Sequence, residues 1–296
     1  MKILKFTLPL VLLGLLIFKI ISDWQTVLPL LTNLNYFFLL TSFLVMLLIY
    51  PEGALGWYMI LRKAKINISL KKAIKIWIVS NTSRYIPGSI WQYISRVEMA
   101  KLKANLDRDK TLSSLLLEIF LVLTAGVLMS AISCSSVRLE EFRIPYWIYL
   151  LPFPLLLLHP FFANKILNFL IKFLKKGKVK YQLSLSLKDT LLVFPYFLLN
   201  FILNGIALFF LIAAITGNFN LSLSSSIGFY SLSWVIGYVT LLSPGGIGVT
   251  EVSLTFLLGL QMPIPVASLV AIVYRFLLTV AELIVFSLCL KKGEND

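Results

Sequence analysis

Long apolar runs joined by short polar connections most restrict how this chain can fold. Charged residues make up 14% of the chain, whereas soluble domains carry about 25%. We therefore predict an all-α, polytopic integral membrane protein with a single transmembrane domain over residues 1–296. Five runs approach or exceed the roughly 18 to 20 apolar residues of a bilayer-spanning helix, at residues 8–21, 36–50, 115–132, 191–215 and 266–290.

Basic residues give the chain a net charge of +14, and most of them lie in short segments between the apolar runs. This distribution is a topology signal and does not indicate a nucleic-acid partner. The positive-inside rule places these groups, and with them both termini, on the cytoplasmic side of the plasma or inner membrane. The groups lie at residues 2–5, 62–75, 96–110, 165–188 and 291–292.

Two apolar segments that contain Pro-Gly do not fit this charge pattern as simple spans. The first, residues 76–95, holds Pro87 and Gly88 and has basic groups on both sides. The second break lies at residues 243–251. A re-entrant hairpin at each position satisfies the charge rule; the alternative is ordinary kinks in eight full spans, with one violation of that rule. The predicted architecture is two re-entrant hairpins in inverted arrangement plus six spans, at about 3–21, 36–61, 111–133, 145–163, 189–216 and 264–290.

Ionisable residues inside the apolar segments need a reason, because a charge at the bilayer centre costs about 2.5–3.5 kcal/mol on insertion scales. Arg84 and Arg96 lie near the first break, and two guanidinium groups there suit a phosphate, which arginine binds bidentately. Gln92 precedes Arg96 by four residues, so both should share one helix face. The alternative for Arg96 is a side chain that extends to the cytoplasmic headgroups.

The glycine-rich second break offers a backbone site for an anion. Gly245, Gly246 and Gly248 would let the main chain approach a ligand, and free N–H groups at the start of the next helix attract an anion. Glu251 falls in the first turn of that helix. It is therefore a plain helix-start residue, a partner of Arg275, or a proton-carrying site.

Arg275 and Glu282 lie seven residues apart in the last apolar run, and so on one helix face. A buried Arg275 must pair with a carboxylate, and Glu118, Glu251 and Glu282 are all candidates. The sequence does not choose among them. We predict that these four residues form ion pairs with a gating role.

The sequence contains few residue patterns that are typical of catalytic or metal-binding sites. The single histidine, His159, has no Ser/Asp arrangement nearby, and the two cysteines, Cys134 and Cys289, have no CxxC spacing. We therefore expect no catalytic residue, no metal, no cofactor and no enzymatic activity. Two alternatives stay open: a membrane-embedded enzyme acting on lipid-linked phosphate or sugar with Glu118 or Glu251 as general base, and an accessory subunit.

Two motifs together resemble the lysylphosphatidylglycerol synthase transmembrane, or flippase-like, family. They are Arg84-x-x-Pro-Gly with the downstream Glu118, and Pro-Gly-Gly-x-Gly-x-x-Glu ending at Glu251, with Arg275 following. In multiple peptide resistance factors the similar domain moves lysyl-phosphatidylglycerol between leaflets, and a separate cytoplasmic domain synthesises it. The present chain shows no such second domain, so the resemblance implies a lipid flippase without synthesis.

The resemblance also implies the partners. They would be membrane lipids, either anionic or aminoacylated phospholipids or polyprenyl-phosphate-linked lipids. A protein partner, if there is one, is a second copy of the chain or a membrane enzyme.

Overall fold

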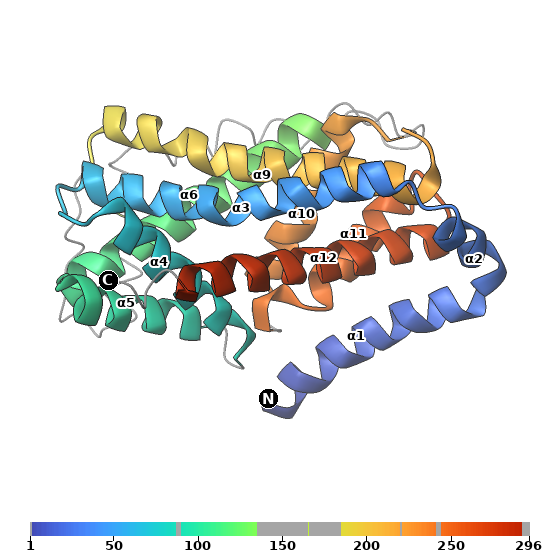
Figure 1. Cartoon of the computed structure of the whole chain (residues 1–296), viewed down its shortest axis with the longest axis horizontal. Coiled ribbons are helices and arrows are strands. Elements are labelled where there is room, and N and C mark those ends of the chain that lie inside the picture. The colour runs from blue at the N-terminus through green and yellow to red at the C-terminus, as the bar shows by residue number, and fades with distance from the viewer. Residues whose placement is uncertain are drawn as a thin grey trace.

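The computed structural model describes residues 2–86, 90–134, 165, 185–219, 221–240 and 244–291, and every regular element within them is a helix. Figure 1 shows a bundle in which the long helices run side by side and the N-terminal helix diverges from the rest. The elements are α1 (Lys2–Ser22), α2 (Trp24–Thr32), α3 (Tyr36–Lys63), α4 (Leu70–Asn81), η1 (Thr82–Tyr85), α5 (Trp91–Ala104), α6 (Arg108–Cys134), α9 (Leu187–Thr216), α10 (Leu223–Val239), η3 (Pro244–Gly246), α11 (Val249–Leu258) and α12 (Ile264–Lys291).

Four of the described helices, α3, α6, α9 and α12, are long and apolar enough to cross a bilayer. They coincide with the spans expected at residues 36–61, 111–133, 189–216 and 264–290. The protein is thus a multi-pass, all-α membrane protein. The span expected at residues 145–163 lies outside the described residues.

The N-terminal span is less simple than expected. A helix covers residues 3–21 as predicted, but the chain then turns by 85° into α2, so α1 and α2 together make at most one broken span. Asp23 lies at the bend, and its carboxylate pairs with Lys19 at 2.7 Å. This polar junction interrupts the apolar run.

Short polar residues determine where several helices begin and end. The Asn35 side chain accepts hydrogen bonds from the main-chain N–H groups of Phe37 and Phe38 at the start of α3. Ser186 and Ser222 start α9 and α10 in the same way. Gly217, with φ of +71°, ends α9 in the left-handed conformation that glycine adopts readily.

Glycines inside the helices allow the bundle to pack closely around α9. A Cβ atom at Gly205 of α9 would lie only 2.3 Å from Cγ1 of Ile227 of α10. At Gly126 of α6, a Cβ atom would meet a ring carbon of Phe201 at 2.8 Å. Membrane helices approach one another through small residues in this way, because van der Waals contact replaces the hydrophobic effect in lipid.

Both segments in which the sequence predicts a break are interrupted. In the first, α4 and the short 3-10 helix η1 precede α5, and α4 packs against α5; Pro87 and Gly88 themselves lie outside the described residues. In the second, α10 packs against α11, with η3 between them. The two 3-10 helices contact each other, so the interrupted ends of both elements meet inside the bundle.

Candidate functional site

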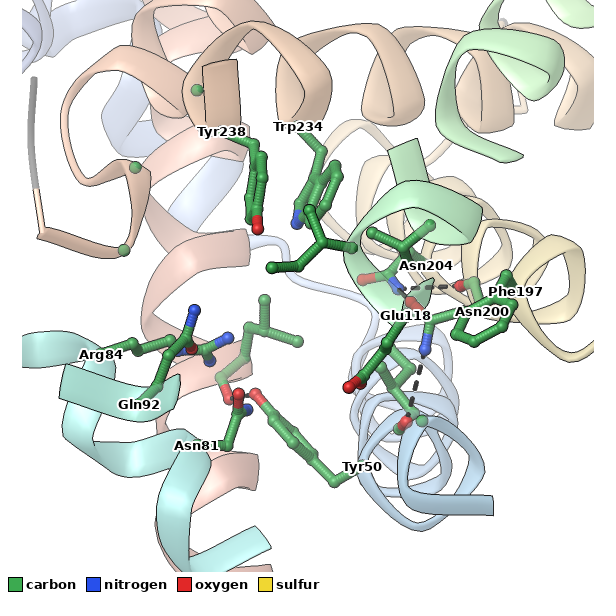
Figure 2. Close-up of a pocket in the computed structure, with 18 of the residues that line it drawn as sticks. Tyr50, Asn81, Arg84, Gln92, Glu118, Phe197, Asn200, Asn204, Trp234 and Tyr238 are labelled. Carbon is green, nitrogen blue, oxygen red and sulfur yellow. Dashed lines mark hydrogen bonds between the residues drawn. The ribbon is translucent and has the colours of Figure 1, made fainter. Parts of the chain in front are cut away.

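A cavity of about 220 Å³ lies where the two interrupted elements meet. In Figure 2, Arg84 and Gln92 enter it from one side, Trp234 and Tyr238 from α10, and Glu118 from the opposite side. The two predicted face-sharing residues of α5, Gln92 and Arg96, both line it. The predicted site residues that line the cavity are Arg84, Gln92, Arg96, Glu118, Gly245, Gly246 and Arg275.

Arg84 connects the first interrupted element to α12. Its Nη2 donates to Oε2 of Glu282 at 2.5 Å, and the Tyr85 hydroxyl donates to the same oxygen at 2.6 Å. Asn81 completes the surroundings of this carboxylate by donating to Oε1 at 3.3 Å. Glu282 is only 1% exposed, whereas the Arg84 side chain is 22% exposed and its buried Nε has no hydrogen-bond partner in the described structure. One end of the Arg84 guanidinium is therefore anchored, and the rest can serve a ligand.

Arg96 makes a different kind of pair. Its Nη1 donates to Oε2 of Glu118 at 2.6 Å, and its Nε donates to Oγ of Ser80 at 3.0 Å. The guanidinium also lies over the rings of Trp57 and Trp77, at 5.4 and 5.1 Å from the ring centroids. With its side chain 3% exposed, Arg96 does not extend to the headgroups. It fixes α5 to α6 and α4.

Arg275 pairs with Glu251. The sequence left three carboxylates open as its partner, and the structure selects this one. The Arg275 Nε and the Glu251 Oε1 are 3.4 Å apart, and Arg275 Nη2 donates to the Gly245 carbonyl at 3.1 Å. Glu251 also accepts from the main-chain N–H of Gly248 at 2.5 Å. That N–H group, which we expected to attract a ligand, is therefore occupied, and Gly248 is not among the residues that line the cavity.

The main chain at Gly245 lies beside two arginines that come from different elements. A Cβ atom at Gly245 would be 3.5 Å from Nη2 of Arg275 and 3.7 Å from Cγ of Arg84. Gly245 and Gly246 have φ of +60° and +73°, which other residues adopt only with strain. The glycines therefore permit both the turn and the close approach. Both arginines line the cavity, and their side chains are 22% and 20% exposed.

The family model described as the lysylphosphatidylglycerol synthase TM region matches residues 4–285. The chain belongs to this family. The resemblance seen in the sequence is thereby confirmed, and the matched range contains both interrupted elements and every residue that lines the cavity. Membership connects the chain with membrane lipids. A comparison with curated proteins finds no match.

Several residues that line the cavity of this family member were not predicted from the sequence. Asn200 and Asn204 of α9 line it, and Asn204 donates to the main-chain oxygen of Asn200 at 2.8 Å (Figure 2). The hydroxyls of Tyr93 and Tyr238, also cavity residues, are 2.5 Å apart and join α5 to α10. Glu52, an ionisable residue inside the span expected at residues 36–61, is a further member. An asparagine in an apolar run is a signal that could have found Asn200 and Asn204.

Proposed function

We propose that this protein is a lipid translocase. It moves an anionic or aminoacylated phospholipid, or a polyprenyl-phosphate-linked lipid, between membrane leaflets, and the lipid phosphate binds at Arg84, Arg275 and the Gly245 main chain. One observation carries the proposal: two arginines from different elements converge on a glycine turn inside a cavity of a membrane helix bundle.

The chemistry of the two arginines supports a phosphate as the group that they bind. Guanidinium groups make short, charge-assisted and often bidentate hydrogen bonds to phosphate oxygens. Each of these arginines already pairs with a carboxylate, Glu282 or Glu251. An entering phosphate must share the guanidinium with that carboxylate, which keeps the bound lipid from being held too tightly to leave. A transport site needs such reversible binding.

We also propose that the two interrupted elements are re-entrant hairpins that enter from opposite sides of the membrane, as the charge pattern predicts. In Figure 1, α4 and α5 lie at the left of the bundle and α11 lies toward the right. Irregular main chain at membrane depth is stable only where protein buries it or where it lines a cavity, and η3 lines this one. Both termini are then cytoplasmic, and the membrane is the plasma or inner membrane.

The helix α12 is the element that we propose to act as the gate. It carries Arg275 and Glu282, which bind the second and the first interrupted element, respectively. A phosphate that competes for Arg84 and Arg275 weakens both attachments together. The pair Arg96–Glu118, which is more completely buried at the arginine, serves as the fixed support of the cavity.

A leaflet-resolved assay tests the translocase. Purified protein is reconstituted into vesicles that contain a labelled phosphatidylglycerol or a labelled polyprenyl phosphate, and the label in each leaflet is followed with time. We expect transfer of at least one of these lipids, slowed in Arg84→Ala and in Arg275→Ala, with Glu98→Gln as a control at an exposed pair outside the cavity. An unchanged transbilayer distribution of both lipids would overturn the proposal.

Recovery of the lipid separates transport from chemistry. We propose that the protein is not an enzyme, so mass spectrometry of the extracted lipid should find it unaltered. A new product would instead favour the membrane-embedded enzyme. Lipids that copurify with the protein, and its mass in detergent, would identify the lipid partner and show whether it joins a second copy or a membrane enzyme.

A further inference from the structure

Glu52 of α3 is a buried carboxylate that the proposed phosphate site does not use. It lines the central cavity, and the residue is 7% exposed. Its Oε2 accepts a hydrogen bond from Nδ2 of Asn200 at 2.7 Å. Its Oε1 is buried and has no hydrogen-bond partner in the described structure. A buried polar atom without a partner is costly, so this oxygen needs an explanation.

The arginines of the site are already matched one to one with the other glutamates. Arg84 pairs with Glu282, Arg96 with Glu118 and Arg275 with Glu251. Among the described residues, Glu52 forms no ion pair with a lysine or arginine, and the hydrogen bond to its carboxylate comes from Asn200. With every group ionised, the site would therefore carry one excess negative charge, which belongs to Glu52.

The groups that face Glu52 across the cavity do not supply the missing positive charge. From α9 it meets only the amide of Asn200, and from α4 the ring of Trp77 packs against the neighbouring Gly53. The other titratable or charged residues that line the cavity are Tyr50 of α3, Arg84 of η1, Tyr93 and Arg96 of α5, Glu118 of α6, Tyr230 and Tyr238 of α10, and Arg275 of α12. The positive charges among these are the three paired arginines.

An anionic lipid phosphate would add a second uncompensated negative charge to this enclosed site. Two such charges in a poorly solvated cavity repel each other strongly. We infer that Glu52 is a proton-binding site coupled to lipid occupancy, an inference that rests on the proposed function. When the lipid phosphate binds, a proton from the aqueous phase adds to Oε1 of Glu52, and it leaves when the lipid leaves. Oε2 keeps its bond from Asn200 in both states.

A chain of hydrogen bonds leads from Glu52 to the helix that we propose as the gate. Asn200 donates to Glu52 at 2.7 Å, and Asn204 Nδ2 donates to the side-chain Oδ1 of Asn200 at 3.3 Å. The Tyr274 hydroxyl in turn donates to Oδ1 of Asn204 at 2.8 Å. Tyr274 directly precedes Arg275 on α12. Protonation of Glu52 weakens the hydrogen bond that its carboxylate accepts from Asn200. That change therefore reaches α12 through contiguous polar contacts.

Proton uptake on lipid binding is the direct test. Short-chain phosphatidylglycerol is added to the purified full chain in weakly buffered detergent with a pH-indicator dye, while binding is measured in parallel. We expect uptake of about one proton per bound lipid at a pH where Glu52 is ionised in the free protein. Glu52→Gln, which imitates the protonated carboxyl, should bind the lipid without uptake, and the exposed control Glu98→Gln should behave as the wild type.

A second variant keeps the inference testable if Glu52→Gln does not fold. Asn200→Ala removes the N–H donor that favours the ionised carboxylate, so Glu52 should already hold its proton at a higher pH. Proton uptake disappears at low pH, where Glu52 is already protonated in the free protein. The pH at which uptake falls to half should therefore be higher in Asn200→Ala than in the wild type. Uptake by Glu52→Gln equal to that of the wild type, or lipid binding by the wild type without uptake at any pH, would overturn the inference. Absence of any lipid binding would overturn it as well.

Transport measurements separate this inference from the translocase. Because lipid occupancy requires the protonated form, the transfer rate of the wild type should fall as pH rises, and that of Glu52→Gln should stay flat. Transfer with the same pH profile in both would contradict the role of Glu52 and leave the translocase standing. Uptake that depends on Glu52 without any transfer would support the proton site and contradict the translocase.

Discussion

The two interrupted elements differ in what they bring to the cavity, although both are tied to α12. The first offers a cation, Arg84, which binds Glu282 of α12; the second offers a carboxylate, Glu251, which binds Arg275 of α12. The polarity of the attachment is thus reversed between the two. Both contribute side chains, and the second also contributes a glycine main chain. The helix α12 is consequently attached to both elements, through two charged residues that lie seven positions apart.

The two attachments also differ in tightness. Arg84 and Glu282 are 2.5 Å apart, and Asn81 and Tyr85 donate to the same carboxylate. Arg275 and Glu251 are 3.4 Å apart. We infer that the first attachment is the stronger of the two and that the second is the easier one to release. Four predictions test this comparison, from the largest expected effect to the smallest.

The largest effect is expected for Glu282→Ala. It leaves the Arg84 guanidinium without its carboxylate, and breaking a buried ion pair by removing one partner costs about 3–5 kcal/mol. Thermal unfolding in detergent should show a strongly lowered midpoint, and lipid transfer should be lost. The double variant Arg84→Ala/Glu282→Ala leaves no unpaired charge there and should recover part of the stability. A double variant no more stable than Glu282→Ala would argue against the pair.

Gly245→Ala should come next. A residue with a Cβ at φ of +60° is destabilised by about 1–2 kcal/mol, and the methyl group would also lie between Arg84 and Arg275. Gly217→Ala is the matched control, because its φ is +71° but nothing lies within 4 Å of the added carbon. The two variants should lose similar stability in thermal unfolding. Only Gly245→Ala should lose most of its lipid transfer, and equal transfer in both would place the phosphate elsewhere.

Glu251→Gln is expected to have a smaller effect on stability. The pair is longer and its arginine is 20% exposed, so the loss should be about 1 kcal/mol or less, and the amide oxygen can still accept from Gly248. The same substitution at Glu282 should lower the unfolding midpoint more. If Glu251→Gln were the more damaging of the two, the assignment of the second attachment as the looser one would be reversed.

The smallest effect is expected where the two elements touch each other directly. Tyr93→Phe or Tyr238→Phe removes one member of a hydroxyl pair and should cost about 0.5 kcal/mol, the lower end of the range for one hydrogen bond between uncharged groups. Because each single variant already breaks the bond, the double variant should cost less than the sum. Unfolding midpoints of the four proteins give this cycle, and strict additivity would show that the hydroxyls do not interact.

Several parts of the site could be read from the sequence because they depend on local properties. Pro-Gly and Gly-Gly disfavour a continuous helix, so the break before Val249 was predictable. Charged residues in apolar runs stand out individually, so Arg84 and Glu118 were found. Which residue each of them pairs with could not be predicted, because Arg84 and Glu282 are 198 residues apart and local spacing says nothing about such a pair.

Glu52 shows the same limit of sequence-based prediction, because the sequence does not reveal that it lacks an arginine partner in the described part of the chain. The sequence marks it as one more carboxylate in a span, no different in kind from Glu118 or Glu282. Only the packed bundle shows that those two have arginine partners and that Glu52 has an asparagine instead. The distinction arises from which helix faces meet, and the pattern along one helix does not contain it.

The sequence by itself determined that this protein lies in a membrane, where its helices are interrupted, and which charges must be buried. Those properties follow from the hydrophobicity of each run and from the conformational limits of proline and glycine. The tertiary structure decided how the charges are paired: it brings three arginines to three glutamates and leaves Glu52 without an arginine partner among the described residues. It alone could do so, because an ion pair requires atoms within a few ångströms, and in a bundle that distance depends on how all the helices pack together.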